Sequence, residues 1–291
     1  MNIPIFLSSD NNYTPFVATT MASICDNTDS FCEFYVLDGG ISKENQEKIC
    51  ELKNKFENFS IEFKTIELEL IKDFSIHNHL SLAAYNRLFI ANLFPNIKKA
   101  LYFDVDVIAI KDITEIFNTN LDNYIIGAAK DMGYKEYIDP VRKNMDLSFK
   151  SVYFNSGVLL MDLEKWRNFN ITKVLFEIEE RYRVKILNCD QDLLNKFFEN
   201  NYKLLKSSYN SRTLEEDTVV LHFYHRLKPW QADFSLDQYN KPYKLKGANF
   251  FWHYAEMTPF YNEILKRKED FLNSNILYKR LNKMVAEGKI K

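Results

Sequence analysis

The sequence predicts an α/β fold with a mostly parallel central sheet flanked by helices. Short apolar runs typical of strands alternate along the chain with segments of helical periodicity. Several of these runs end in polar turns, as strands do where a sheet forms a ligand site. The 291 residues are 46% hydrophobic and 27% charged, a composition that excludes disordered and collagen-like proteins.

The first hundred residues predict a β-α-β-α-β unit. Its three strands are expected over residues 3–8, 33–37 and 61–66. Pro15 lies in the first turn of the first helix, and Ser42 caps the second. A helical pattern over residues 81–94 follows and ends before Pro95. Such alternation favours parallel strands with helices on both faces of the sheet.

A fourth strand, over residues 100–103, leads into Asp104-Val105-Asp106. Side chains alternate along an extended chain, so Asp104 and Asp106 share one face. Two anions held together favour a cation, which is usually a divalent metal. Because ligands bind beyond the carboxyl ends of the strands in open α/β sheets, a metal-diphosphate is expected here. The simpler interpretation is a pair of solvated aspartates that opens a loop.

The second half of the chain continues the alternation without repeats or linkers. Strands are expected over residues 124–129, 152–160 and 219–223, and helices over residues 170–183 and 190–201. Gly157 interrupts a β-like run, which indicates a close backbone approach. We expect a catalytic domain over residues 1–240 and a helical, basic extension over residues 241–291.

Charge and cysteine content bear on the partners and the cellular compartment of the protein. A net charge of −2 gives no reason to expect nucleic acid as a partner, although residues 266–291 carry eight Lys/Arg against three Asp/Glu. The four cysteines lack C-x-x-C spacing, as free thiols in a reducing compartment do. The chain shows no signal-peptide pattern and no apolar run long enough to span a membrane, so a cytoplasmic location is expected.

Six motifs then occur in a characteristic order. They are Asp10-Asn11-Asn12-Tyr13, Tyr85-Asn86-Arg87-Leu88, Leu101-Tyr102-Phe103-Asp104-Val105-Asp106, Phe154-Asn155-Ser156-Gly157-Val158, Asp190-Gln191-Asp192 and residues 222–230. Together they resemble glycosyltransferase family 8, over roughly residues 3–230. That family contains retaining, nucleotide-sugar-dependent enzymes of the GT-A fold, such as glycogenin and bacterial lipooligosaccharide galactosyl- and glucosyltransferases. The resemblance implies transfer of glucose or galactose from a UDP-sugar to a bacterial surface glycan or glycoconjugate, as in lipopolysaccharide biosynthesis.

The resemblance also implies roles for individual residues. Asp104, Asp106 and His222 match the metal ligands, and this donor set suits Mn²⁺, with Mg²⁺ as the alternative. Other positions match residues that bind the donor or its sugar: Ser8, Asp10, Asn12, Arg87, Asp131, Asn155, Asp190 and Gln191. The Gln191 amide oxygen would face the anomeric carbon, and Lys228 would stabilise the diphosphate leaving group.

One residue departs from the family pattern. His225 stands where the family has a glycine beside the diphosphate. We expect it to contribute to donor binding as an imidazolium that donates to phosphate, aided by Arg226 and Lys228. His77 and His79 resemble a ligand pair, but we interpret them as loop histidines because no family motif uses that position.

Structural roles are the alternative at the other sites. Without the family register, His222 would be a hydrogen-bonded core histidine, Asp190 a helix cap and Asn155 a bulge residue. Two other functions compete. A haloacid dehalogenase-type phosphatase also uses D-x-D, but needs a threonine where this chain has Ile108. A non-catalytic protein that binds sugar nucleotides or glycans would use the same fold.

The basic tail suggests a location at the inner face of the membrane. Leu277, Leu281, Met284 and Val285 recur at helical spacing among lysines and arginines. Such a helix can lie on anionic lipid, so the tail is a candidate for peripheral membrane contact. Docking of the same helix onto its own domain is the alternative.

Overall fold

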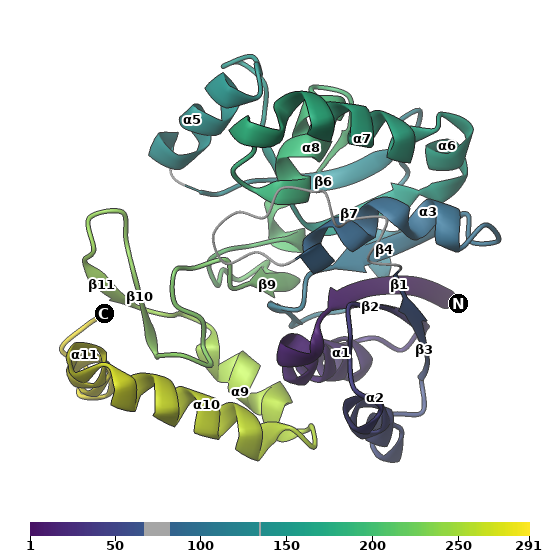
Figure 1. The fold of residues 1–291 in the computed structure, drawn as a ribbon. Coiled ribbons are helices and arrows are strands. Elements are labelled where there is room, and N and C mark those ends of the chain that lie inside the picture. Colours follow the sequence, from purple (N-terminus) through teal and green to yellow (C-terminus); the bar gives the residue numbers. More distant parts are fainter. Residues whose placement is uncertain (67–81, 134) are drawn as a thin grey trace.

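The computed structural model describes residues 1–66, 82–133 and 135–291. Within them, the central sheet consists of β1 (Asn2–Ser9), β2 (Phe31–Asp38), β3 (Phe59–Thr65), β4 (Lys99–Phe103), β6 (Ile126–Lys130), β7 (Phe154–Asp162) and β8 (Lys203–Leu205). Their order is β3-β2-β1-β4-β7-β6-β8 (Figure 1). Only β7 runs antiparallel to its neighbours in this sheet. The predicted mostly parallel sheet is confirmed.

Different helices cover the two faces of the sheet (Figure 1). One face carries α1 (Thr14–Asn27), α2 (Lys43–Cys50), α4 (Thr114–Asn118), α9 (Ala248–Glu256) and the start of α10 (Tyr261–Ser274). The other carries η4 (Leu82–Phe89), α3 (Ile90–Leu93), α5 (Lys135–Asn144), α6 (Leu163–Asn168), α7 (Ile171–Tyr182) and α8 (Cys189–Phe197). The sheet therefore lies between two helical layers, as the sequence predicts.

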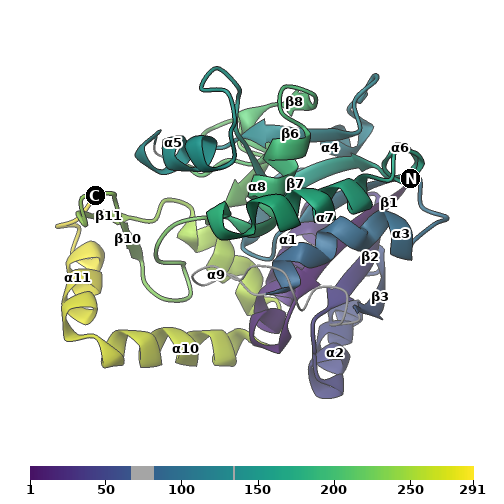
Figure 2. The ribbon, with the colours of Figure 1, turned by 45° about the horizontal axis from the view of Figure 1, so that its top comes forward.

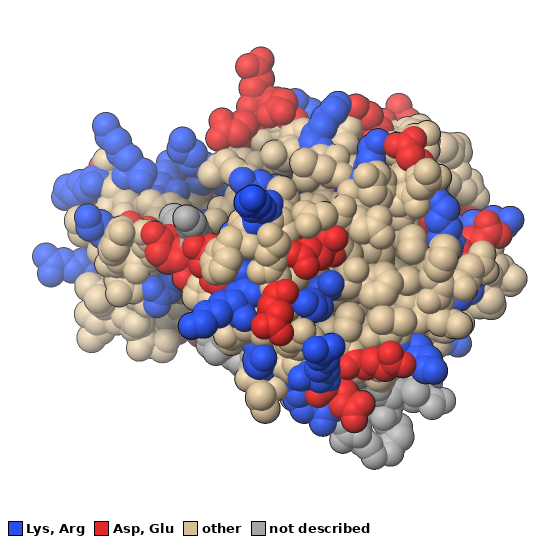
Figure 3. Space-filling model, turned by 90° about the horizontal axis from the view of Figure 1, so that it is seen from above, with Lys and Arg blue, Asp and Glu red and all other residues tan. Residues whose placement is uncertain are grey.

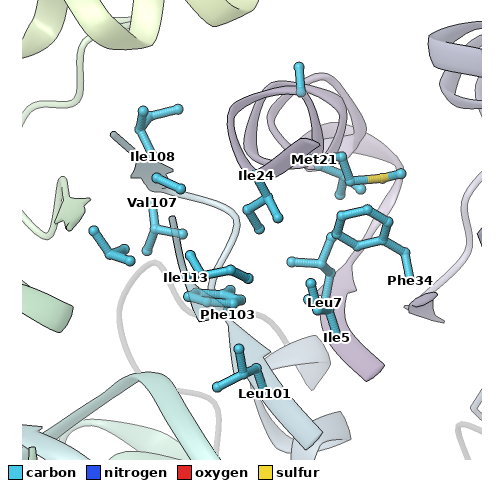
Figure 4. Close-up of a cluster of buried hydrophobic side chains, with 14 of the residues drawn as sticks. Ile5, Leu7, Met21, Ile24, Phe34, Leu101, Phe103, Val107, Ile108 and Ile113 are labelled. Carbon is cyan, nitrogen blue, oxygen red and sulfur yellow. The ribbon is translucent and has the colours of Figure 1, made fainter. Parts of the chain in front are cut away.

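The alternation of side chains along the strands divides the core into two clusters. On β1, Ile5 and Leu7 belong to the cluster under α1, whereas Phe6 belongs to the opposite one, and all three are fully buried. Figure 4 shows Met21 and Ile24 pointing from α1 toward the sheet. The helix is buried on every side over most of its length, because each residue from Thr14 to Cys25 is buried.

The segment expected as a helix over residues 81–94 has a different form. Its described part is a 3-10 helix, η4, followed by the single turn α3. A 3-10 helix has three residues per turn, so Tyr85 and Leu88 lie on the same side, and both are fully buried. Residue 81 and the two histidines His77 and His79 lie outside the described residues.

A small second sheet connects distant parts of the chain. It pairs β5 (Val107–Ala109) with β9 (Val220–His222) in antiparallel orientation, so that Val107 lies opposite His222. Short 3-10 helices lie in connections between other elements: η1 (Asn11–Tyr13), η2 (Glu51–Asn54), η5 (Arg183–Lys185) and η6 (Ser207–Tyr209). The β5–β9 pair brings the loop after β4 next to a strand more than one hundred residues later.

The C-terminal part forms an arm that projects from the sheet domain (Figure 2). It contains the hairpin β10 (Phe234–Leu236) and β11 (Pro242–Lys244), then α9, α10 and α11 (Ile276–Ala286). The expected domain boundary at residues 240 and 241 falls in the hairpin turn and stays a prediction. Phe251 of α9 belongs to the same hydrophobic cluster as the buried residues of α1, so α9 joins the arm to the sheet domain.

The last helix, α11, docks partly onto the arm itself. Val285 is buried against Phe234 and Leu236 of the hairpin, and Leu281 is partly buried beside them. Leu277 and Ile276, in contrast, are 61% and 85% exposed. The structure thus shows the docking alternative for one end of the predicted apolar face.

Two observations relate to the expected environment of the protein. All four cysteines are free, and Cys25, Cys32 and Cys189 are buried. In the described part of the chain, no helix combines the length and apolarity that a membrane span needs.

Candidate active site

The metal ligands predicted from the sequence lie together at the carboxyl end of β4. Asp104 and Asp106 follow that strand, and the pairing of β5 with β9 places His222 beside them. The backbone N–H of Phe223 also donates to the Asp106 carbonyl, at 2.9 Å. Strand pairing therefore positions the His222 ring against two carboxylates from a distant part of the sequence.

Each carboxylate uses one oxygen for a cationic side chain and turns the other toward His222. Asp104 Oδ1 accepts from Arg87 at 2.7 Å, and its Oδ2 lies 3.9 Å from His222 Nε2. Asp106 Oδ2 accepts from Lys228 at 2.6 Å, and its Oδ1 lies 3.0 Å from the same nitrogen. Ligand atoms of the three residues lie within 4.8 Å of one another, a grouping that can hold a metal ion.

Electrostatics keep Asp106 ionised at this site. Burial alone would raise the pKa of Asp106, but the Lys228 ammonium and the His222 ring outweigh it and hold that pKa well below its usual range. A deprotonated carboxylate is the form that binds a cation. The charge at Asp106 is therefore available at any pH near neutrality.

Gly157 explains how the ligands approach so closely. A Cβ atom at this position would lie 2.2 Å from His222 Cε1 and 2.8 Å from Asp104 Oδ2. Both atoms belong to the three side chains that could hold a metal ion, Asp104, Asp106 and His222, which we call the metal group. The close backbone approach predicted for this glycine is confirmed.

Arg87 connects the metal group to Asp190. Its side chain is 5% exposed, and its Nε lies 3.1 Å from Asp190 Oδ2 while Nη1 donates to the Ser156 carbonyl at 2.7 Å. The guanidinium also stacks over the Tyr102 ring, at 4.1 Å from its centroid. Burial raises the pKa of Asp190 to about 7, although Arg87 opposes the shift.

The side chains expected around the transferred sugar form a hydrogen-bonded group. Asp131 Oδ2 accepts from Asn155 Nδ2 at 3.2 Å and from Gln191 Nε2 at 3.1 Å. The Gln191 oxygen accepts from the backbone N–H of Ser156 at 3.0 Å. Because a backbone N–H can only donate, this contact fixes which end of the Gln191 amide is the oxygen.

The sequence assigns no role to several residues that the structure places around this site. Tyr153 and Asn210 are buried and hydrogen-bonded to Gln191 and His222 of the predicted site, and the buried Asp192 is a partner of Tyr153. The Tyr153 hydroxyl donates to Asp192 at 2.5 Å and accepts from Gln191 at 3.2 Å. Tyr153 directly precedes the motif that begins at Phe154, and Asp192 ends the motif that begins at Asp190. The sequence therefore locates both residues without indicating their roles.

The residues expected to bind the donor nucleotide lie at the end of β1. Ser8 accepts from Asn86 Nδ2 at 3.2 Å, next to Arg87 in the chain. Asp10 Oδ1 accepts from the backbone N–H groups of Asn12 and Tyr13, at 2.9 and 3.1 Å, so this carboxylate stabilises the turn. No hydrogen bond described in the structure joins these residues directly to the metal group, and their roles stay predictions.

The structure gives His225 other partners than the phosphate expected for it, and its role in donor binding stays a prediction. Its Nδ1 lies 2.8 Å from the Tyr243 hydroxyl of β11, and its Nε2 lies 3.1 Å from the Arg212 carbonyl. Burial, with the Arg212 and Lys228 charges, lowers the pKa of His225 to about 3. The ring is therefore neutral near pH 7, and both nitrogens are occupied by protein groups.

Comparison with known proteins identifies the family. A model of glycosyl transferase family 8 matches residues 4–233, which is most of the chain. The chain belongs to glycosyltransferase family 8. This family 8 member is 30% identical over 215 residues to a relative from Haemophilus influenzae, covering 74% of this chain and 65% of that protein. It is 26% identical to the lipopolysaccharide 1,2-glucosyltransferase of Escherichia coli over 260 residues, covering 79% and 76% of the two chains.

A solved structure supports the same assignment. The family 8 chain is similar to the galactosyltransferase LgtC, crystallised in complex with donor and acceptor sugar analogues, with a TM-score of 0.75 and 26% identity. The match covers 88% of this chain and 96% of LgtC. The GT-A architecture expected from the sequence motifs is thereby confirmed.

Proposed function

We propose that this chain is a retaining, metal-dependent hexosyltransferase that moves glucose or galactose from a UDP-sugar to a bacterial surface glycan or glycoconjugate. The observation that carries the proposal is the connection between the predicted metal ligands and the predicted sugar pocket. Arg87 contacts Asp104 on one side and Asp190 on the other. A nucleotide sugar has both a diphosphate and a sugar, so a site for it needs a metal centre for the diphosphate and an adjoining pocket for the sugar.

The donor atoms fit a divalent metal ion. Asp104, Asp106 and His222 would hold it, and an imidazole beside two carboxylates favours Mn²⁺ over Mg²⁺. When bound, the metal would neutralise charge on the diphosphate. Lys228, which contacts Asp106 in this structure, is close enough to add positive charge at the same place.

Retention is proposed from the family resemblance, and the residue at the reacting face favours one route to it. The family position near the anomeric carbon carries Gln191, whose amide oxygen accepts from the Ser156 backbone N–H at 3.0 Å and lies 3.5 Å from the Ser156 hydroxyl. An amide is a much weaker nucleophile than a carboxylate. We therefore favour departure of the diphosphate followed by attack of the acceptor on the same face, over a stable covalent intermediate.

The similar proteins support the choice of sugar and acceptor. One is named a lipopolysaccharide glucosyltransferase and another a galactosyltransferase. The alternative is a non-catalytic protein that binds sugar nucleotides or glycans. The phosphatase alternative loses support because Asp104, its candidate nucleophile, has Oδ1 held by Arg87 and by the Tyr102 hydroxyl.

We also propose a cytoplasmic location with peripheral contact at the inner face of the membrane. The exposed side chains of Ile276 and Leu277 lie next to Lys279 and Arg280 on α11. Figure 3 shows lysine and arginine side chains gathered at the left of the face that it draws, the side where Figure 1 places the hairpin and the C-terminus. Apolar and cationic side chains together suit anionic lipid.

A donor panel tests the proposed substrate class. Thermal unfolding with Mn²⁺ should show the largest stabilisation with UDP-glucose or UDP-galactose, since a ligand at a hundred times its dissociation constant adds about 2.7 kcal/mol. UDP-N-acetylglucosamine and GDP-mannose serve as comparisons. Asp106→Asn should lose the metal-dependent part of the shift. Equal shifts for all donors, or none, would contradict the proposal.

A further inference from the structure

Asn210 joins the His222 ring to Asn155, although no sequence motif includes it. It follows η6 directly and is 1% exposed. One end of its amide lies 2.8 Å from His222 Nδ1, and the other lies 2.8 Å from Asn155 Oδ1. A buried amide with a partner at each end has a defined orientation, which the neighbouring groups determine.

The backbone of Gly157 fixes that orientation. Its N–H donates to Asn155 Oδ1 at 3.0 Å, and a backbone N–H cannot accept. This atom of Asn155 is therefore the oxygen, so the Asn210 group beside it must be the NH₂. The oxygen of Asn210 then faces His222 Nδ1. It follows that Nδ1 carries a hydrogen, whether the ring is neutral or protonated.

This arrangement leaves His222 Nε2 for a metal ion. Nε2 is the ring nitrogen that faces Asp106 Oδ1, at 3.0 Å. A histidine that binds metal ordinarily donates its other N–H to a carbonyl or carboxylate oxygen, which sets the tautomer and the ring orientation. We propose that Asn210 is the positioning residue of the metal centre and holds His222 as an Nε2 ligand.

The same contacts join the metal centre to the sugar pocket. Asn155 accepts from Asn210 and donates to Asp131, which in turn accepts from Gln191. Asn210 thus has two separable functions: its oxygen orients His222, and its NH₂ holds Asn155. A carboxylate at position 210 would keep the first function and lose the second.

Mn²⁺ affinity of the metal-free protein, measured from the electron paramagnetic resonance signal of free Mn²⁺, tests the proposal. Asn210→Leu removes the acceptor for Nδ1–H and should weaken Mn²⁺ binding about 10- to 100-fold, as loss of such a partner typically does. Asn210→Asp restores an acceptor and should stay within about threefold of the wild type. If Asn210→Leu does not fold, Asn210→Ala carries the same prediction.

Asn58→Leu is the matched control, because it also removes a hydrogen-bonded amide away from the site. Asn58 is half-buried directly before β3 and donates to the Cys25 and Thr28 carbonyls at the C-terminal end of α1. This variant should leave Mn²⁺ affinity unchanged. Equal affinity in the wild type and Asn210→Leu, or an equal loss in Asn210→Leu and Asn210→Asp, would overturn the role of Asn210. The inference rests on the proposed function, and a wild type that does not bind Mn²⁺ would refute the metal site itself.

Discussion

At the scale of single residues, the site depends on Gly157 as much as on the side chains that would bind the metal. The backbone of Gly157 donates to Asn155 and lies against both His222 and Asp104. A side chain there has no room, since its Cβ would overlap the imidazole ring. The metal group therefore requires glycine for steric reasons alone.

Gly157→Ala should weaken Mn²⁺ binding at least tenfold, because the methyl group displaces the His222 ring from the carboxylates. Overpacking should also cost about 1–3 kcal/mol of unfolding free energy. Calorimetric titration with Mn²⁺ and urea unfolding measure the two effects.

Gly127→Ala is the control for this variant. The nearest neighbours of its Cβ would be the side chains of Leu121 and Leu205, at 3.1 Å, so this variant should leave Mn²⁺ affinity unchanged. Wild-type Mn²⁺ affinity in Gly157→Ala would show that the ring can move aside without loss of the site.

The sequence identifies residues of strong chemical type better than the residues that orient them. Asp104, Asp106 and His222 could be grouped from the D-x-D spacing and the family resemblance, and the structure brings them together. Asn210 could not be predicted, because a single asparagine is common and its partners come from other strands. The surroundings of His225 could not be predicted either, because the Tyr243 hydroxyl lies 18 positions away in a hairpin that no motif reveals.

The low pKa of His225 predicts an effect on stability. Its pKa of about 3 in the folded protein lies below the value of about 6.5 expected when unfolded, so the unfolded chain binds the proton first as pH falls. The stability that neutral His225 provides is complete above pH 6.5 and decreases toward pH 3. Between pH 7 and pH 5, the unfolding free energy of the wild type should fall by about 1–2 kcal/mol more than that of His225→Gln, whose side chain stays neutral.

Urea unfolding of both proteins at the two pH values measures this difference. UDP affinity gives an independent check, since a ring that is neutral at pH 6 and pH 8 should make the effect of His225→Ala the same at both. A larger effect at pH 6 would restore the imidazolium interpretation.

At the scale of elements, hydrophobic periodicity predicts where helical segments lie but not how a segment coils. The first predicted helix forms as α1, whereas the expected helix over residues 81–94 is largely the 3-10 helix η4. The apolar face of α11 is also divided by tertiary contacts. Val285 packs on Phe234 and Leu236 of the hairpin, and Leu277 stays exposed, so the division depends on an element well before α11 in the chain.

The exposed end of α11 should bind anionic lipid. Leu277→Glu in the full chain removes an exposed apolar side chain next to Lys279 and Arg280, so flotation with phosphatidylglycerol liposomes should fall several-fold. Phe169→Glu, at a site 64% exposed on the sheet domain, is the control and should float like the wild type. Equal flotation of all three proteins would remove the membrane proposal.

At the scale of the whole molecule, the fold gathers residues from Ser8 to Lys228 at one site. The strand alternation predicts that the parallel strands β1 and β4 end on the same side. It does not predict the approach of Asn155 on the antiparallel β7 or of His222 on β9 of the second sheet. The position of the C-terminal arm was not predictable, since its contacts with α1 depend on aromatic side chains such as Phe251 and Trp230 that fit only in three dimensions.

The release of UDP from UDP-glucose and UDP-galactose, followed with Mn²⁺ and with a chelator, tests the central claim most directly. Transferases often hydrolyse their donor slowly without acceptor, so the wild type should release UDP with Mn²⁺ and stop when the metal is removed. Asp104→Asn and Asp106→Asn should each lose this activity, because the remaining ligands no longer hold the metal. Undiminished UDP release in the presence of the chelator, or in both variants, would contradict a metal-dependent transferase at this site.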